Sequence, residues 1–291
     1  MMNNTSVDPS PDALPPQKMA VKAEGVGVRK VGESFLNLLL LGILAGAYVA
    51  LGALFATTVS AGATGILSYG LTRLLMGLAF SLGLILVIIG GAELFTGNTL
   101  IAVAWASGKV STGGLLRNWA IVYLGNFLGS ILIAALVIWG RQYAAGGGSV
   151  GLAMLSMANA KLHLSFWQAV SLGVLCNLLV CLGVWLSYAG RSVADKILGI
   201  VFPITAFVAA GFEHSVANMY FIPLGLFLKQ FDPAFTTSTA VQAGLDLSSL
   251  TWSNFLWDNL LPVTLGNIIG GAVMVGLVYW AIYLRRRPAG L

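Results

Sequence analysis

The sequence Gly-Ala-Glu-Leu-Phe-Thr-Gly-Asn occupies residues 91–98, near the middle of an apolar run that extends over residues 74–106. As one straight helix rising 1.5 Å per residue, this run would reach roughly 50 Å, well beyond the ~30 Å of hydrocarbon in a bilayer. A second run of similar length, residues 197–228, carries Gly-Phe-Glu-His-Ser-Val-Ala-Asn at residues 211–218. The glycines and polar side chains inside both runs predict two discontinuous helices, each broken near the membrane interior.

The composition of the chain is that of an integral membrane protein. Of its 291 residues, 58% are hydrophobic and only 9% are charged, whereas soluble domains contain about 25% charged residues. So few charges cannot cover a water-facing surface, which excludes soluble enzymes and free nucleic-acid binders. The two cysteines, Cys176 and Cys181, lie in one apolar stretch and form neither a disulfide framework nor a thiolate metal site.

Six membrane spans are predicted, of which the second and fifth are broken. The four unbroken spans cover roughly residues 35–58, 116–139, 166–188 and 254–284. Most of the 15 Lys and Arg residues fall in segments that six spans place on one side of the membrane, which predicts that both termini are cytoplasmic. The basic charge balance is therefore a topology signal, and no nucleic-acid partner is expected.

The predicted organisation has three parts. Residues 1–33 form a cytoplasmic N-terminal segment, with a disordered polar tail over residues 3–17 and a short interfacial helix from Met19 to Glu33. Residues 34–284 form the six-helix transmembrane channel domain. Residues 285–291 form a cytoplasmic C-terminal tail.

The first three spans resemble the last three in sequence and in order. Gly-x-Glu followed five residues later by Asn occurs at residues 91–98 and again at residues 211–218. Leu-Gly-Asn-x-x-Gly occurs at residues 124–129 and again at residues 265–270. Because each repeat holds three spans, the two copies must have opposite orientations in the membrane. Such 3+3 inverted repeats with broken helices place a permeation site where the breaks meet.

Polar residues that occur in both copies are interpreted as structural supports of the breaks. Glu93 and Glu213 form one such pair, and we expect each carboxylate to accept hydrogen bonds from freed backbone N–H groups. The alternative is a direct role in transport. Two asparagine pairs also match, and an amide facing a pore would serve both purposes. These pairs are Asn98 with Asn218 and Asn126 with Asn267.

His214 has no polar counterpart in the first repeat, because the matching position is Leu94. Its unperturbed pKa of about 6.5 lies near physiological pH. The favoured hypothesis is a pore histidine that presents a hydrogen-bond donor or a proton to a passing anion, and the alternative is a neutral buried histidine satisfied by its neighbours. Thr96, opposite Val216, is also unmatched. Its hydroxyl is expected either to bridge histidine and substrate or to act as a local cap.

Several further residues have simpler interpretations. Glycines such as Gly91, Gly125, Gly129 and Gly270 are expected to allow close helix packing. No metalloprotease, serine-hydrolase or Walker motif is present, and the two histidines lie far apart without a carboxylate cluster. No enzymatic activity, metal site or cofactor is therefore expected.

The two break sequences, together with Met-Ala-x-Lys-Ala-Glu at residues 19–24, closely resemble the formate/nitrite transporter family. The resemblance runs from about Pro15 to Tyr283. It implies an all-α, aquaporin-like fold assembled as a homopentamer with one pore per subunit, located in the bacterial cytoplasmic (inner) membrane. The chain has no Asn-Pro-Ala motif, so its likeness to aquaporins is limited to architecture.

The resemblance also assigns roles to individual residues. The central histidine of the family falls on His214, its neighbouring glutamate on Glu213 and the threonine of the second span on Thr96. A vestibule lysine falls on Lys161, for which a solvated loop residue is the alternative, and the pore asparagines fall on Asn177 and Asn267. The constriction residues fall on Leu84, Leu94 and Phe207, with Phe80, Phe95 and Val180 beside them.

The implied substrates are small monovalent anions of weak acids, together with protons. Formate is favoured by Ile-Pro-Leu-Gly at residues 222–225, whereas Thr-Gly-Asn at residues 96–98 resembles nitrite and hydrosulfide members as well. Acetate and lactate also occur as substrates in the family. A different class of function, a non-conducting membrane sensor or scaffold, would show ligand binding without flux.

Overall fold

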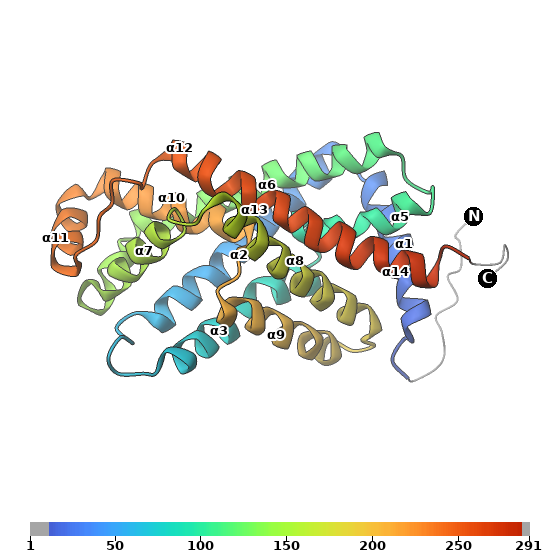
Figure 1. The fold of residues 1–291 in the computed structure, drawn as a ribbon, viewed down its shortest axis with the longest axis horizontal. Coiled ribbons are helices and arrows are strands. Elements are labelled where there is room, and N and C mark those ends of the chain that lie inside the picture. Colours follow the sequence, from blue (N-terminus) through green and yellow to red (C-terminus); the bar gives the residue numbers. More distant parts are fainter. Residues whose placement is uncertain (1–11, 287–291) are drawn as a thin grey trace.

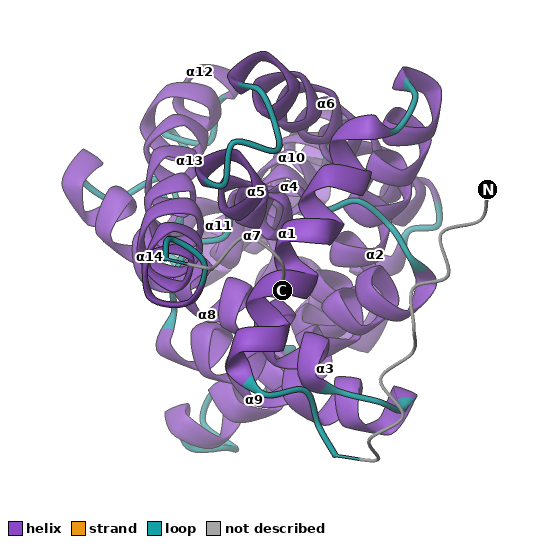
Figure 2. Ribbon diagram, turned by 90° about the vertical axis from the view of Figure 1, so that its right-hand side faces the viewer, coloured by secondary structure: helices purple, strands orange, loops and turns teal. Residues whose placement is uncertain are grey.

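The computed structural model describes residues 12–286. Within that range the chain is helical and contains no strand (Figure 2), as the sequence predicted. Most of the predicted polar tail and the last five residues of the predicted C-terminal tail lie outside the described residues.

Six helices of the described chain are long and apolar enough to cross a membrane, which confirms the predicted number of spans. They are α2 (Phe35–Ser60), α3 (Tyr69–Gly90), α6 (Thr112–Trp139), α8 (Phe166–Ala189), α9 (Val193–Ala210) and the helix Trp252–Tyr283. The last of these consists of α12 (Trp252–Asn254), η3 (Phe255–Leu260), α13 (Leu261–Ile268), η4 (Ile269–Leu277) and α14 (Val278–Tyr283).

Shorter helices complete the fold. After the first break, α4 (Phe95–Asn98), η1 (Thr99–Ile101) and α5 (Ala102–Ala106) follow, and after the second break α10 (Ser215–Phe231) follows. The others are α1 (Pro16–Gly32), η2 (Gln142–Gly148), α7 (Ser149–Ala160) and α11 (Pro233–Ala243). α1 corresponds to the helix that was predicted to begin near Met19.

The bundle has two distinct ends (Figure 1). α1, α5 and α14 lie together at one end, here called the α1 end, and α7 and α11 lie together at the other, here called the α7 end. α3 leads into α5 at the α1 end, whereas α9 leads into α10, which packs on α7 and α11 at the α7 end. The two interrupted segments therefore run in opposite directions, as an inverted repeat requires.

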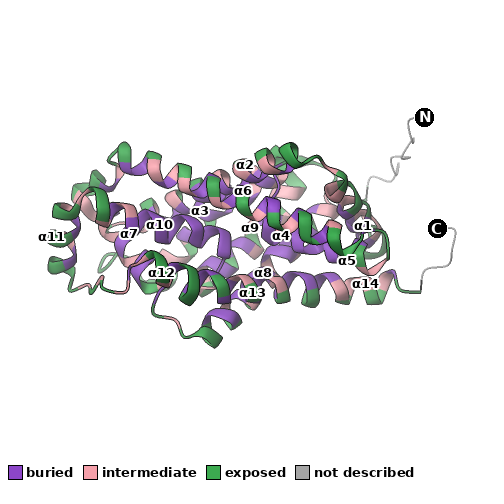
Figure 3. Cartoon of the chain, turned by 90° about the horizontal axis from the view of Figure 1, so that it is seen from above, coloured by how far each residue is buried: buried purple, intermediate pink, exposed green. Residues whose placement is uncertain are grey.

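Each spanning helix begins at a hydroxyl side chain that accepts a hydrogen bond from the third backbone N–H of the helix. These N-cap residues are Ser34, Ser68, Ser111, Ser165, Ser192 and Thr251. The first N–H groups of a helix have no partner within it, and a Ser or Thr cap satisfies one of them. The outer faces of the spans carry exposed apolar side chains, such as Leu40, Leu124 and Leu132, while buried residues fill the centre (Figure 3).

Both predicted breaks are present and are built alike. α3 ends at Gly91, whose φ of 80° lies in the left-handed region, and α9 ends at Gly211, whose φ is 77°. After each glycine the backbone is extended as far as Leu94 and His214, and the next helix begins one residue later. A glycine adopts positive φ at no steric cost. Gly91 therefore serves the turn and not close packing, because a Cβ there would meet nothing within 4 Å.

Other glycines hold the first and third spans of each repeat in close contact. A Cβ on Gly129 of α6 would lie 2.0 Å from the carbonyl oxygen of Ile43 in α2, and a Cβ on Gly270 would lie 2.2 Å from the carbonyl oxygen of Val174 in α8. Two matched helix pairs therefore pack backbone against backbone, as small residues in membrane helices allow.

We expect Gly129→Ala to destabilise the folded protein by about 1–3 kcal/mol, since the added methyl overpacks a contact between two backbones. Gly113→Ala in the same helix is the matched control, because a Cβ there meets nothing within 4 Å. Thermal unfolding of purified protein in detergent measures the difference. Equal melting temperatures for the two variants would contradict this account of the α2–α6 contact.

Candidate functional site

The two breaks bring His214 and Thr96 together at the centre of the bundle. Thr96 Oγ1 lies 3.0 Å from His214 Nε2, and both side chains are buried. The other ring nitrogen, Nδ1, accepts a hydrogen bond of 3.0 Å from the backbone N–H of Ala217. His214 is thus the N-cap of α10 as well as the partner of Thr96.

These contacts define the tautomer of His214. A backbone N–H donates to Nδ1, so Nδ1 carries no hydrogen, and a neutral imidazole then carries its single hydrogen on Nε2. The Nε2–H group donates to Thr96 Oγ1, which leaves the hydroxyl hydrogen of Thr96 for another acceptor. This assignment follows from the hydrogen-bond network.

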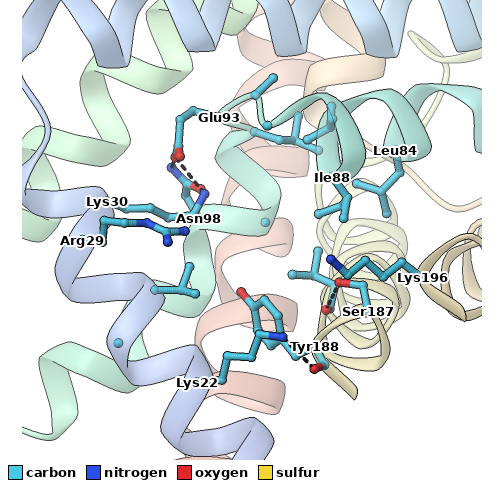
Figure 4. A pocket seen from close by; sticks show the side chains of 18 residues that line it. Lys22, Arg29, Lys30, Leu84, Ile88, Glu93, Asn98, Ser187, Tyr188 and Lys196 are labelled. Carbon is cyan, nitrogen blue, oxygen red and sulfur yellow. Dashed lines mark hydrogen bonds and ion pairs between the residues drawn. The ribbon is translucent and has the colours of Figure 1, made fainter. Parts of the chain in front are cut away.

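Two cavities approach this centre from opposite ends. A cavity of about 260 Å³ at the α7 end borders His214 and is lined by two cationic residues, Arg73 and Lys161. A cavity of about 570 Å³ at the α1 end borders the first break from Gly91 to Leu94 (Figure 4). They are called here the α7-side cavity and the α1-side cavity.

Apolar side chains separate the two cavities. Phe80 and Phe207 border the α7-side cavity and meet edge to face, with ring centroids 5.6 Å apart. Leu84 and Leu94 border the α1-side cavity. These four are among the six residues to which the resemblance assigns the constriction. Their apolar surfaces favour exclusion of water and hydrated ions.

The two remaining predicted constriction residues border neither cavity. Phe95 packs edge to face against Tyr123 of α6, with ring centroids 4.8 Å apart, and borders neither cavity. Val180 of α8 is buried and also borders neither cavity.

Glu213 belongs to a network of charged and amide side chains at the α7 end. Lys161 Nζ donates to Glu213 Oε1 over 2.8 Å, and Asn218 Nδ2 donates to Glu213 Oε2 over 2.7 Å. Asn218 Nδ2 also donates to Asn259 Oδ1 over 2.7 Å, and Asn259 Nδ2 donates to the carbonyl oxygen of Lys161 over 2.9 Å. Every charge of this largely buried ion pair thus has a hydrogen-bonding partner.

The same network recurs around Glu93 at the α1 end. Lys30 Nζ donates to Glu93 Oε2 over 2.8 Å, and Asn98 Nδ2 donates to the same oxygen over 2.7 Å. Asn98 Nδ2 also donates to Asn118 Oδ1 over 2.9 Å, and Asn118 Nδ2 donates to the carbonyl oxygen of Lys30 over 3.1 Å. Lys30 belongs to α1, which lies outside the repeat.

The prediction that Glu93 and Glu213 accept hydrogen bonds from freed backbone N–H groups is wrong about their partners. In the described residues their carboxylates bind lysine and asparagine side chains, because an ion pair stabilises a buried charge better than neutral N–H groups do.

Asn126 and Asn267, in contrast, bind backbone groups of the breaks and of a neighbouring span. Asn126 Oδ1 accepts from Phe95 N–H over 2.9 Å, and its Nδ2 donates to the carbonyl oxygens of Gly42 and Glu93.

Asn267 repeats these bonds in the second copy. Its Oδ1 accepts from Ser215 N–H over 2.9 Å, and its Nδ2 donates to the carbonyl oxygens of Gly173 and Glu213. Each of the two asparagines thus joins the extended segment of a break, the start of the half-helix that follows it and a neighbouring span.

Asn177 of α8 is bound to the backbone of the first break. Its Nδ2 lies 3.1 Å from the carbonyl oxygen of Thr96, 3.1 Å from Thr99 Oγ1 and 2.6 Å from the carbonyl oxygen of Asn267. Thr99 Oγ1 donates to the same Thr96 carbonyl over 2.6 Å. Gly271 leaves room for this cluster, because a Cβ there would lie 2.0 Å from Thr99 Oγ1. Asn177 borders neither cavity.

Sequence reasoning missed Lys30 and two asparagines of these networks. Asn118 and Asn259 could have been found from the repeat. Asn118 precedes Asn126 by eight residues, and Asn259 precedes Asn267 by the same number. Lys30 had none, because it lies in a helix that has no counterpart in the second repeat.

Comparisons with known proteins agree with this geometry. A sequence model of the formate/nitrite transporter family matches residues 17–281. The formate channel FocA of Escherichia coli K12 is 46% identical over 275 residues, covering 94% of this chain and 96% of that protein. FocA of Haemophilus influenzae is 43% identical over 266 residues, covering 91% and 93%.

Solved structures give the same result. A structure described as a pentameric formate channel with formate bound matches with a TM-score of 0.79 and 45% identity, covering 86% of this chain and 98% of that one. A second, described as an FNT family ion channel, matches with a TM-score of 0.77 and 32% identity, covering 91% and 98%. The predicted aquaporin-like, six-span fold is confirmed.

We expect Asn126→Ala and Asn267→Ala each to destabilise the protein by several kcal/mol. Each substitution removes the acceptor of one buried N–H, that of Phe95 or Ser215, and the side-chain donor of one carbonyl in the extended segment, that of Glu93 or Glu213, at about 1–3 kcal/mol per group. Asn37→Ala is the control, since the exposed Asn37 amide donates only to Glu33. Thermal unfolding in detergent and the yield of folded protein measure the effect, and wild-type stability in both variants would refute the assigned role.

Proposed function

This chain belongs to the formate/nitrite transporter family, and we propose that it is a membrane channel for formate. The observation that carries the proposal is the buried pair of His214 and Thr96, which lies between two cavities lined by cationic residues. Among its relatives are formate channels of Escherichia coli and Haemophilus influenzae. We therefore propose formate, and not nitrite or hydrosulfide, as the substrate of this chain. The function is transport, not catalysis.

We extend the proposal to assembly and location. The solved formate channel is pentameric, and we propose a homopentamer with one pore in each subunit. We propose that the α1 end faces the cytoplasm and the α7 end lies outside a bacterial cytoplasmic membrane, which the excess of Lys and Arg in the loops of the α1 end supports. α1 then lies at the cytoplasmic mouth of the pore.

Electrostatics bring the anion to the pore from both sides. Lys161 and Arg73 border the α7-side cavity, and Lys30 is one of the cations that border the α1-side cavity. The half-helices that begin at Phe95 and Ser215 also start at the centre of the bundle, so their positive dipole ends lie close to it. A small anion is therefore attracted as far as the apolar residues.

The apolar constriction admits formate only in a nearly neutral form. A carboxylic acid titrates near pH 4 in water, but moving a carboxylate into an apolar environment carries a large free-energy cost. Loss of water therefore raises the pKa of formate, and the anion takes up a proton from the water in the cavity. Passage of formic acid moves no net charge.

His214 contributes a hydrogen bond to this passage. Because Nδ1 accepts the Ala217 N–H, the ring has one hydrogen, on Nε2, and releasing it as a proton would leave an imidazolate. The geometry therefore favours a relay in which His214 Nε2–H donates to Thr96 Oγ1 and the Thr96 hydroxyl hydrogen donates to formate, with water as the proton source. Of the two roles predicted for His214, this is the one that the contacts support.

Asn177 and Asn267 act on this pair indirectly. The predicted role of both as pore asparagines implied direct contact with the anion, but their amide hydrogens face backbone carbonyls. We propose that Asn177 is a positioning residue, which holds the Thr96 carbonyl so that the Thr96 hydroxyl meets His214.

We expect His214→Asn to conduct formate with the wild-type dependence on pH. Asparagine supplies an N-cap acceptor for Ala217 and an N–H donor toward Thr96, but it does not titrate. Flux in proteoliposomes should fall about tenfold per pH unit above the pKa of formic acid. His214→Leu, which lacks the donor, should conduct about 10- to 100-fold less. Conduction by His214→Asn without any dependence on pH would show that His214 supplies the proton.

The positioning role of Asn177 is tested by a double-mutant cycle with Thr96. We expect Asn177→Leu and Thr96→Val each to reduce formate flux about tenfold or more, and the double variant to be no worse than either single one. Position 177 ceases to matter once the hydroxyl that it orients is absent. Multiplication of the two losses in the double variant would contradict the coupling.

A further inference from the structure

The α1-side cavity holds more positive charge than transport of a monovalent anion requires. Four cationic side chains line it: Lys22, Arg29 and Lys30 from α1, and Lys196 from α9 (Figure 4). Within residues 12–286, Lys30 is the only one of the four that forms an ion pair, with Glu93. Among the described residues, the other three have no carboxylate partner. They lie on two walls of one cavity of about 570 Å³.

These cations repel one another, which an anion bound among them would relieve. The pKa of Lys22 is lowered, first by burial and then by the charges of Lys196 and Arg191. Lys22 Nζ donates to the carbonyl oxygen of Tyr188 over 2.9 Å, which holds its charge at the wall of the cavity. Three unneutralised cations around one space fit a ligand with more than one negative charge.

The α7-side cavity has a smaller surplus of positive charge, because only two cations line it and one of them is paired. Lys161 is paired with Glu213 over 2.8 Å, and Arg73 donates to the carbonyl oxygens of Val208 and Ala209 at the end of α9. With a volume of about 260 Å³ it is also the smaller of the two. Counted in the same way, the α7-side cavity has one cation without a carboxylate partner among the described residues, Arg73, against three in the α1-side cavity.

We propose that the α1-side cavity binds a multivalent oxyanion of the phosphate type, and that the bound anion blocks formate from that side. Phosphate presents several oxygen acceptors and close to two negative charges, which suit an Arg fork and two Lys side chains. Such an anion cannot pass Leu84 and Leu94, because a multivalent anion loses far more hydration energy than formate does. It therefore stays in the cavity and competes with formate. The inference rests on the proposed function only for the block, not for the binding.

The source of the phosphate group is a free anion of the cytoplasm. α1 lies over the middle of the bundle at this end (Figure 2), and the cavity beneath it is lined by residues of α3, α4, α8 and α9. A lipid headgroup carries the same chemistry but would have to reach this position from the outer face of the bundle.

The test measures formate uptake by membrane vesicles in which inorganic phosphate replaces chloride at constant ionic strength. In inside-out vesicles, where the α1 end faces the medium, millimolar phosphate should slow uptake, and in right-side-out vesicles it should not. Arg29→Gln and Lys196→Gln should each raise the half-inhibiting phosphate concentration about tenfold, the effect of one charge-assisted hydrogen bond. Arg117→Gln, an exposed cation outside the cavity, should behave as wild type.

Equal inhibition from both sides, or unchanged inhibition of the Arg29 and Lys196 variants, would overturn the proposal. Phosphate binding to the purified protein, measured by calorimetry, tests the site even if the protein proves not to conduct formate. Binding should weaken in the same two variants. Inhibition that depends on adding phosphatidylglycerol to proteoliposomes, and not on free phosphate, would refute the assignment to a free anion.

Discussion

A broken helix inside a membrane must find partners for the backbone groups that the break exposes, and the structure depends on how this chain does so. No water is available in hydrocarbon to bind a free N–H or C=O group. Asn126 and Asn267 supply one acceptor and two donors each, directed at the extended segment of a break, at the start of the next half-helix and at a neighbouring span. Without these bonds the breaks would close into straight helices or unfold, and no polar centre would form between the cavities.

The inverted repeat separates support from function. Glutamates, asparagines and turn glycines occupy matching positions and make matching bonds in both copies. His214 corresponds to Leu94 in the other copy, and Thr96 corresponds to Val216. His214 and Thr96 meet at the centre of the bundle. The carbonyl of Thr96 is held by Asn177, whereas that of Val216 accepts from Ser130 over 3.5 Å. The supporting residues thus follow the repeat, whereas the central pair, His214 and Thr96, does not.

The sequence was sufficient to predict the six spans, both breaks and the unmatched pair of polar residues, since length, hydropathy and repetition are local properties. It was not sufficient to assign hydrogen-bond partners. Glu93 was expected to bind the backbone nearby, but it pairs with Lys30, 63 residues away. Asn177 was expected to face the anion, and its actual orientation follows from the room beside Gly271. Such contacts depend on how helices pack, which spacing along the chain does not reveal.

The two lysines of the matching networks come from parts of the chain that do not match. Lys30 belongs to α1, which precedes the first repeat, and Lys161 follows α7 in the connection between the repeats. The glutamate of each network belongs to the repeated sequence pattern, but the lysine does not. A change confined to α1 can therefore alter the charge balance at one break and leave the other break untouched.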